Sequence, residues 1–570
     1  MTPGPYHPPM TRHLVTSALP YANGPIHLGH VAGAYLPADL YVRGLRQMGE
    51  EVLFVCGADE HGVAITIGAE KAKQGYDEYV EHWRGDIKKT FDSLGIAFDT
   101  WSGTSVCPDH EETTQEFFRL LDDQGYLIRR EIEQLYCTKD EMYLADRYVE
   151  GTCYNCGAEN ARGDECPDCG TWIETLRLKE PRCKLCGGPP ERRNTSHWFL
   201  DLPALRDKKI AKWIEDHDWK SNVSAFIKGL LKDAPERAIT RDMKWGVPVP
   251  EDRAEGISGK VLYVWFDAPI GYISFTKEWA RKQGRPDDWK LWWQNDETHL
   301  THFIGKDNIP FHCLVFPSML WGTGQNYILP HAVPANEFYS MAGGKFSTSE
   351  GRTFDLEEYL KEIDPEVVRC YLTATLPETA DAEFKKEDLV TFNNSSLASN
   401  LGNLGSRVLK FIAKNFDSQI PELAPEHEAD LDKLLFECSV SCEDPGKDLL
   451  AFRFRRSLED VLALATAANV FMQRCEPWKT NKTDPVLAGS QLNTLCEWIA
   501  LLARWLAPFA PGKAQELWQQ LGAAGEVSQG GWPKVPSAEN SQWRSGLGGR
   551  ALGELGTLFP RIEAPVAEKK

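Results

Sequence analysis

Short apolar runs alternate with longer helical patterns in the first part of the chain. The run at residues 14–19 is partly β-branched and ends at a proline, and a second run lies at 52–56, so both are typical of buried strands. Between them, residues 23–25 predict a turn, and residues 26–46 predict a helix that Pro25 opens. Strand, turn, helix and strand in this order predict a parallel α/β sheet. Runs that would add further strands lie at 261–266 and 303–305.

The strand patterns stop after about Leu389. Ser457-Leu-Glu-Asp460 predicts a capping box that opens an apolar helix through Met472. Residues 491–506 predict another long helix, which the prolines at 508 and 511 close. The last third of the chain is therefore predicted to be a separate helical domain.

Composition narrows the class of protein. The chain has 570 residues, enough for three to four domains at about 150 residues each, and its 42% hydrophobic content suits a folded protein. Its net charge of −20 means that a nucleic acid would have to meet a local basic patch. No uninterrupted apolar stretch reaches the roughly 18 residues of a membrane span, and no secretory leader is recognisable, so we expect a cytoplasmic protein.

Two histidines, His27 and His30, lie three residues apart at the start of the first predicted helix. This spacing places them on one face of a helix N-terminus, which favours anions through its free N–H groups. Gly29 between them removes a side chain where a flat base would approach the backbone. The pair alone fits a core or surface role equally well, whereas its place after a strand and turn favours phosphate binding.

Six of the 15 cysteines form three Cys-x-x-Cys pairs between about residues 151 and 190. Cys153 with Cys156 and Cys166 with Cys169 are separated by nine residues, which predicts a closed tetrahedral zinc site. Such a site is structural and would staple a small insert that lacks a core of its own. Paired disulfides are the alternative.

The third pair, Cys183 and Cys186, has no fourth pair after it. We expect it to be a turn without metal, which predicts a zinc-to-protein ratio near one. His197 is the alternative ligand for this pair.

Residues 19–30, Leu-Pro-Tyr-Ala-Asn-Gly-Pro-Ile-His-Leu-Gly-His, resemble the first signature of the class I aminoacyl-tRNA synthetases, in the form of the methionyl-tRNA synthetase family. Residues 345–349, Lys-Phe-Ser-Thr-Ser, are similar to the second signature, a lysine-rich loop. Further blocks resembling this family, in the same order, lie at 57–62 and 264–272, at 302–307, and at 558–562, which is similar to a terminal strap.

The resemblance implies an enzyme that attaches methionine to its tRNA in two steps, through a methionyl-adenylate, for translation initiation and elongation. The implied substrates are methionine, ATP with Mg²⁺ and a tRNA with a CAU anticodon, and the implied fold is a split Rossmann-like domain with a zinc insert and a helical anticodon domain. A monomer without membrane contact is expected. The expected divisions are 1–121 and 245–340 for the two catalytic halves, 122–244 for the zinc insert, 341–388 for the lysine loop and stem contacts, and 389–570 for the anticodon domain.

The resemblance also implies roles for individual residues. The α-ammonium group of methionine would pair with Asp59. ATP would contact His27, Gly29, His30, Lys345 and Thr348. The methionine side chain would be held by Leu19, Tyr21, Trp265, Ala268, Pro269, Tyr272 and His312. The anticodon would be read by Asn403, Arg407 and Trp478. Asn308 falls at a pocket position that is apolar in some relatives.

One position departs from the family pattern. Thr348 replaces the second lysine of the loop, so a neutral hydroxyl stands where an ammonium group would neutralise phosphate charge. Either another cation compensates, or the activation step is slowed.

Other functions remain open from the sequence. A class I synthetase of another specificity, such as cysteine, is the nearest alternative, and a non-catalytic tRNA-binding relative is the next. A zinc-ribbon DNA-binding module would leave most of the chain unexplained.

Overall fold

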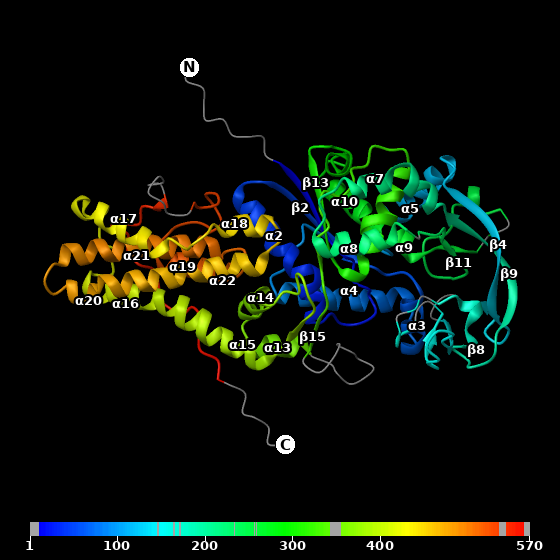
Figure 1. Ribbon diagram of the computed structural model, residues 1–570, viewed down its shortest axis with the longest axis horizontal. Helices are drawn as coiled ribbons and strands as arrows, with labels where there is room; N and C mark the ends of the chain where they lie inside the picture. Colours follow the sequence, from blue (N-terminus) through cyan, green and yellow to red (C-terminus); the bar gives the residue numbers. More distant parts are fainter. Residues whose placement is uncertain are drawn as a thin grey trace, which may run out of the picture.

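The computed structural model describes residues 11–563 except 145–147, 164–165, 170, 172, 233, 256, 258, 342–354 and 535–542. The molecule is elongated, with an α/β part at one end and a bundle of helices at the other (Figure 1). Lys345 and Thr348, the two predicted loop residues, lie outside the described residues.

A five-stranded parallel sheet forms the centre of the α/β part, with strand order β14-β13-β1-β2-β3. The first strand lies between β13 and β2, and its residues Leu14 and Val15 are fully buried. The predicted parallel sheet is therefore confirmed. Its strands are β1 (Arg12–Ser17), β2 (Glu51–Ala58), β3 (Thr100–Gly103), β13 (Thr298–Gly305) and β14 (Ala335–Asn336).

The strand predicted at 261–266 is wrong. Only β12 (Val261–Leu262) is extended there, and it pairs antiparallel with β11 (Thr240–Arg241) outside the main sheet. The chain then enters helix α9 (Val264–Asp267). A short apolar run has the same pattern in a buried helix and in a buried strand, so periodicity alone could not separate them.

The predicted first helix begins at Leu28 rather than at Ile26. It runs through α1 (Leu28–His30), the π-helical segment η1 (Val31–Tyr35) and α2 (Leu36–Met48), and it ends at Gly49 with φ 93°. Other helices that accompany the sheet are α3 (Val63–Ala72), α4 (Tyr76–Ser93), α5 (His110–Asp123), α10 (Gly271–Lys282), α11 (Trp289–Trp293) and α12 (Phe316–Gly322).

The insert lies at the end of the molecule opposite the helical bundle (Figure 1). Its two long strands, β4 (Leu127–Cys137) and β9 (Glu191–Leu200), pair antiparallel along ten residues of each. The cysteine-bearing part adds β6 (Val149–Thr152), β7 (Ala161–Arg162) and β8 (Lys179–Cys183). Shorter elements are β5 (Met142–Tyr143), β10 (Arg237–Ala238), α6 (Leu202–Leu205), α7 (Ala211–Glu215) and α8 (Ser221–Leu230).

The predicted helical domain is confirmed. Its described regular elements are α15 (Lys386–Phe392), η10 (Asn393–Gly402), α16 (Asn403–Asn415), α17 (Pro425–Ser439), α18 (Pro445–Leu450), α19 (Phe454–Cys475), α20 (Pro477–Thr480), α21 (Pro485–Leu506) and α22 (Pro511–Gln520). The segment that links it to the sheet contains β15 (Tyr339–Met341), α13 (Leu356–Glu362), α14 (Pro365–Ala374) and β16 (Ala382–Phe384).

The predicted capping box at Ser457 is wrong. Helix α19 begins one turn earlier at Phe454, and the Ser457 hydroxyl donates to the carbonyl of Pro445 at 2.7 Å. The Ser457 hydroxyl therefore bonds to a carbonyl outside its own helix, whereas the local pattern predicted that it would cap the start of the helix. Among the described helices, α21 alone is long and apolar enough to cross a membrane, and 89% of its most apolar window is buried in the protein, as in a core helix.

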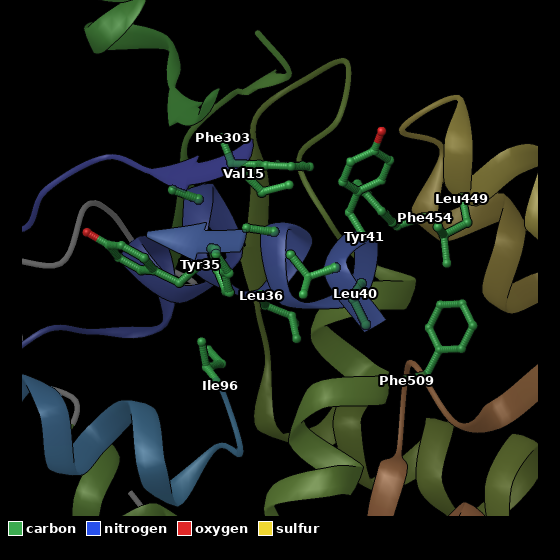
Figure 2. Close-up of a cluster of buried hydrophobic side chains, with 14 of the residues drawn as sticks. Val15, Tyr35, Leu36, Leu40, Tyr41, Ile96, Phe303, Leu449, Phe454 and Phe509 are labelled. Atoms are coloured by element: carbon green, nitrogen blue, oxygen red, sulfur yellow. The ribbon is translucent and has the colours of Figure 1, made fainter. Parts of the chain in front are cut away.

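The sheet and the helical domain share one hydrophobic core. Figure 2 shows Tyr41 of α2 beside Leu449 and Phe454 of the helical domain. Buried Arg369 of α14 donates to the carbonyls of Pro508 and Phe509, each at 3.0 Å, and pairs with Asp39 of α2 at 2.7 Å. The helix that carries His27 and His30 at its start is thus fastened directly to the helical domain.

Candidate active site

The histidine pair caps the helix that begins at Leu28. The Nδ1 atom of His27 accepts a hydrogen bond from the Gly29 amide, and the Nδ1 atom of His30 accepts one from the His27 amide, both at 3.1 Å. The two rings stack with centroids 3.8 Å apart. Because both Nδ1 atoms accept, each neutral ring carries its proton on Nε2, where it can be donated to a ligand.

Both imidazoles are neutral at physiological pH. Burial, and then the neighbouring His30, lower the pKa of His27 to about 3. The protein surrounding His30 lowers its pKa to about 4, although the side chain keeps an exposed edge. The pair therefore offers neutral N–H donors to phosphate oxygens rather than two cations.

Gly29 is required by its neighbours. A Cβ atom at this position would lie 2.6 Å from the carbonyl oxygen of Tyr339 and 2.9 Å from the His27 ring. The segment β15, which carries Tyr339, closes directly over the helix start. Any side chain at position 29 would push these two elements apart, so glycine keeps the site compact.

Tyr272 and His312 form the floor of the predicted methionine pocket. The Tyr272 hydroxyl donates to Nε2 of His312 at 2.9 Å, because Nδ1 of His312 donates to the carbonyl of Asn308 at 3.1 Å. Burial lowers the pKa of His312 to about 4 and raises that of Tyr272 well above its usual value. Both groups are therefore neutral, and the Asn308 position contributes a backbone carbonyl.

Three aromatic side chains, Tyr21, Trp265 and Phe311, contact one another. Trp265 packs edge-to-face against Tyr21, with ring centroids 6.4 Å apart, and stacks on Phe311 at 3.8 Å. Leu19 lies partly buried against the main core. Ala268 and Pro269 follow Trp265 and precede Tyr272 in the sequence. They form part of the single turn η6 (Ala268–Ile270), and both are buried.

Asp59 lies immediately after β2 and is 4% exposed. Its backbone is held between two residues of the first signature, since its amide donates to Pro20 at 2.8 Å and its carbonyl accepts from Ala22 at 2.9 Å. Burial, and then the nearby Asp267, raise its pKa well above the usual range. A buried carboxyl of this kind is a receptor for a cation such as an ammonium group.

Cys56 is fully buried on β2, where its thiol donates to the Ser17 carbonyl at 3.6 Å. Burial raises the pKa of this thiol. The sequence-based interpretation of Cys56 as a small buried strand residue fits this environment.

The four cysteines predicted to bind zinc come together. Their sulfur atoms all lie within 4.8 Å of one another, with Cys156 and Cys166 3.6 Å apart and Cys153 and Cys169 3.9 Å apart. All 15 cysteines are free thiols, so the disulfide alternative is wrong. Four thiols with this spacing fit a tetrahedral zinc ion.

The expectation that Cys183 and Cys186 lack partners is wrong. Cys137 and Asp140, at the end of β4, complete a second cluster whose ligand atoms also lie within 4.8 Å of one another. Asp140 accepts from the thiols of Cys137 at 3.0 Å and Cys183 at 3.1 Å. A single cysteine followed by an aspartate had no recognisable metal pattern in the sequence, and only the pairing of β4 and β9 closes this loop.

His197 does not join this cluster. Its Nδ1 atom lies 2.9 Å from the Thr240 hydroxyl and its Nε2 atom 3.1 Å from Asp242. The alternative ligand role for His197 is therefore wrong.

The predicted anticodon residues lie at the far end of the helical domain. Asn403 and Arg407 are four residues apart on α16 and share one face, and the Arg407 guanidinium lies 5.5 Å from the centre of the Trp478 ring. Arg407 and Trp478 also line a cavity of about 160 Å³. The structure thus joins two of the three residues and leaves Asn403 exposed on the same helix face.

Comparisons with known proteins agree with this architecture. Residues 13–409 match the family described as tRNA synthetases class I (M), and residues 422–565 match the anticodon binding domain of methionyl tRNA ligase. The methionine–tRNA ligase of Protochlamydia amoebophila is 44% identical, over 92% of this chain and 74% of its own. That of Rubrobacter xylanophilus is 43% identical over 89% of each chain.

A solved structure agrees on the fold. It is described as Mycobacterium tuberculosis methionyl-tRNA synthetase in complex with methionyl-adenylate, and it matches with a TM-score of 0.74 and 24% identity, covering 97% of this chain and 100% of that one.

Proposed function

This chain belongs to the methionyl family of class I tRNA synthetases, and we propose that its site activates methionine with ATP and passes it to a tRNA with a CAU anticodon. The observation that carries the proposal is the junction of three features at the carboxyl edge of β1 and β2. These are a buried carboxyl at Asp59, an aromatic slot around Tyr272 and a helix start with two neutral histidines.

Activation joins a carboxylate oxygen of methionine to the α-phosphorus of ATP and releases pyrophosphate. The carboxylate is already ionised at neutral pH, so the reaction needs positioning and stabilisation of phosphate charge rather than a general base. His27 and His30 supply Nε2–H donors at the helix start, and ATP brings Mg²⁺ on its phosphates. The predicted contacts of Lys345 and Thr348 with ATP remain part of the proposal.

The slot suits an unbranched thioether. Trp265, Tyr272 and Phe311 provide aromatic faces and edges, with which a sulfur atom makes favourable contacts. The neutral Tyr272–His312 pair closes the floor without a charge, so a charged side chain would lose its hydration there. Cysteine, the nearest alternative substrate, has a shorter side chain that would make fewer contacts with these rings.

We propose that tRNA is read at the far end of the helical domain, where Trp478 stacks on a base and Asn403 and Arg407 form hydrogen bonds. Arg407 beside Trp478 supports this, because a cation next to an aromatic face suits a splayed single-stranded base. The 15 reduced cysteines fit a reducing compartment, and we place the enzyme in the cytoplasm.

Zinc would bind Cys153, Cys156, Cys166 and Cys169 and hold the insert in its fold, with no open position for chemistry. The expected ratio of one zinc per chain assumed that Cys183 and Cys186 have no further ligands beside them. With Cys137 and Asp140 present, we expect a ratio near two by elemental analysis. Cys137→Ser should lower this ratio by about one. A ratio of one in the unmodified protein would show that the second cluster binds no metal.

The experiment that tests the proposed function is ATP–pyrophosphate exchange with each of the twenty amino acids. Exchange with methionine alone supports the proposal. Exchange with cysteine instead would show that the enzyme is specific for cysteine, and no exchange with any amino acid would indicate a non-catalytic relative. Trp478→Ala should then reduce tRNA charging about ten- to hundredfold while leaving exchange unchanged. Equal loss in both assays would contradict the anticodon assignment.

A further inference from the structure

A group of buried polar side chains lies behind Asp59 and has no part in the reaction as described so far. His61 bridges two carboxyl groups, since its amide donates to Asp59 at 3.4 Å and its Nδ1 atom lies 2.6 Å from Oδ2 of Asp267. Asp267 is fully buried, and its second oxygen, Oδ1, has no hydrogen-bond partner. His61 and Asp267 are 206 residues apart in the chain, so their contact could not be predicted from the spacing of a motif.

The charges in this group do not balance. Among the described residues, neither Asp59 nor Asp267 forms an ion pair with a lysine or an arginine. Burial raises the pKa of both carboxyls, and the nearby charge of Asp267 raises the pKa of Asp59 further. Of the two carboxyls, the His61 ring contacts Asp267 alone, and Asp59 meets only the uncharged His61 amide, so the described residues give the two buried carboxyls at most one cationic partner.

The groups that face the pair do not supply that cation. Glu60, next to Asp59, is neutralised by its ion pair with Arg84 of α4 and accepts from the Ser105 hydroxyl at 2.7 Å. Tyr272 of α10 is neutral. His110 of α5 has its Nδ1 atom 2.9 Å from Ser274, and burial lowers its pKa well below the usual value.

We propose that Asp59, His61 and Asp267 form a proton-exchanging counter-ion for the α-ammonium group of the amino acid. One proton is held on the two carboxyls in the free enzyme. When the ammonium group enters, its positive charge replaces that proton, which passes to water, and the O–H bond of one carboxyl is the only bond that breaks. Asp267 acts here as a positioning residue through His61, and the inference rests on the proposed role of Asp59.

Calorimetric titration of the full chain with methionine tests this directly. The observed heat, measured near pH 7 in buffers of different ionisation enthalpy, gives the number of protons released. We expect about one proton per methionine, falling toward zero as the pH rises above the raised pKa of the free carboxyl, because the group is then already ionised. Binding with no buffer dependence near pH 7 would overturn the proposal.

A variant and a ligand keep the test specific. Asp267→Asn preserves the shape but removes the second negative charge, so proton release at the same pH should fall well below one. A merely structural role would change the affinity and leave the proton count unchanged, and that result would contradict the proposal. Ser274→Ala, which contacts only His110 in this group, is the matched control and should keep the count near one.

The second ligand is 4-(methylsulfanyl)butanoate, which is methionine without its amino group. We expect it to bind without releasing a proton, and release with this ligand would show that the carboxyl pair does not sense the ammonium group. If methionine itself fails to bind to the unmodified enzyme, the proposed function fails. If it binds without proton release, only this inference fails.

Discussion

The two ends of the candidate active site are built differently. The amino-acid end is enclosed by buried side chains from β2, α9, α10 and η8 (Phe311–Val315), and its Tyr272–His312 hydrogen bond is already formed. The phosphate end presents backbone amides and two neutral imidazoles at one helix start, and His30 is exposed. We therefore expect discrimination between amino acids to depend on side chains that are already packed together, and charge stabilisation to depend on groups that meet the triphosphate when it binds.

This difference follows from chemistry. A thioether is recognised by shape and apolar contact, which require a packed wall. A triphosphate carries its charge on exposed oxygens and is bound by donors that point outward. The variants below change one end at a time, from the largest expected effect to the smallest.

The largest effect is expected from Asp59→Asn at the amino-acid end. The buried carboxylate would no longer balance the ammonium group, and breaking a buried charge pair costs about 3–5 kcal/mol, so kcat/KM for methionine should fall about a thousandfold. Pyrophosphate exchange at varied methionine measures this, and KM for ATP should change little. Asp99→Asn, on the neighbouring connection and paired with Arg46, is the control and should lower stability only. A loss below tenfold would contradict the assignment of Asp59.

At the phosphate end, His30→Ala removes one donor to the transferring phosphate. Loss of a single such donor costs about a hundredfold or more in kcat, so we expect about that fall in exchange with an unchanged KM for methionine. The variant also removes the hydrogen bond to the His27 amide, which costs roughly 1 kcal/mol of stability, so the melting temperature must be followed in parallel. An equal rise in KM for methionine would show that the two ends are not separable.

Thr348→Lys should strengthen the phosphate end. A second loop cation would stabilise developing phosphate charge, and we expect adenylate formation to become roughly two- to tenfold faster in single-turnover measurements. Methionine affinity should not change. An unchanged rate would mean that the missing charge is already supplied elsewhere.

The smallest effect concerns pH. Because the pKa of His27 is about 3 and that of His30 about 4, both rings gain charge only below these values and stay neutral above them. The parameter kcat/KM for ATP should therefore show no fall due to these rings as the pH rises from about 6 to about 8. A fall centred near 6.5 that His30→Ala abolishes would show that a charged imidazole binds the phosphate.

The sequence predicted the features that are local in the chain. The first strand, the turn and the histidine pair each lie within a few residues, and the four cysteines lie between residues 153 and 169, so the spacing of these residues in the sequence indicates their chemistry. The features that were missed join distant segments. Phe311 stacks on Trp265, Asp140 faces Cys183, and Asp267 binds His61 only because the sheet and insert fold around them.

Two other errors concern short segments of the chain. The run at 261–266 was too short for its period to distinguish strand from helix. Ser457 had the pattern of a helix cap, but the apolar stripe of α19 starts at Phe454 and the serine hydroxyl found a tertiary acceptor. At Ser457, packing between elements overrode the local signal.

The most direct test of the central claim is a crystal structure of this chain with a non-hydrolysable analogue of methionyl-adenylate. The account predicts the thioether between Trp265 and Tyr272, the ammonium group against Asp59 and the phosphate-mimicking group at the start of α1 beside His27 and His30. An analogue bound with its side chain outside this slot, or with its phosphate mimic away from the helix start, would contradict it.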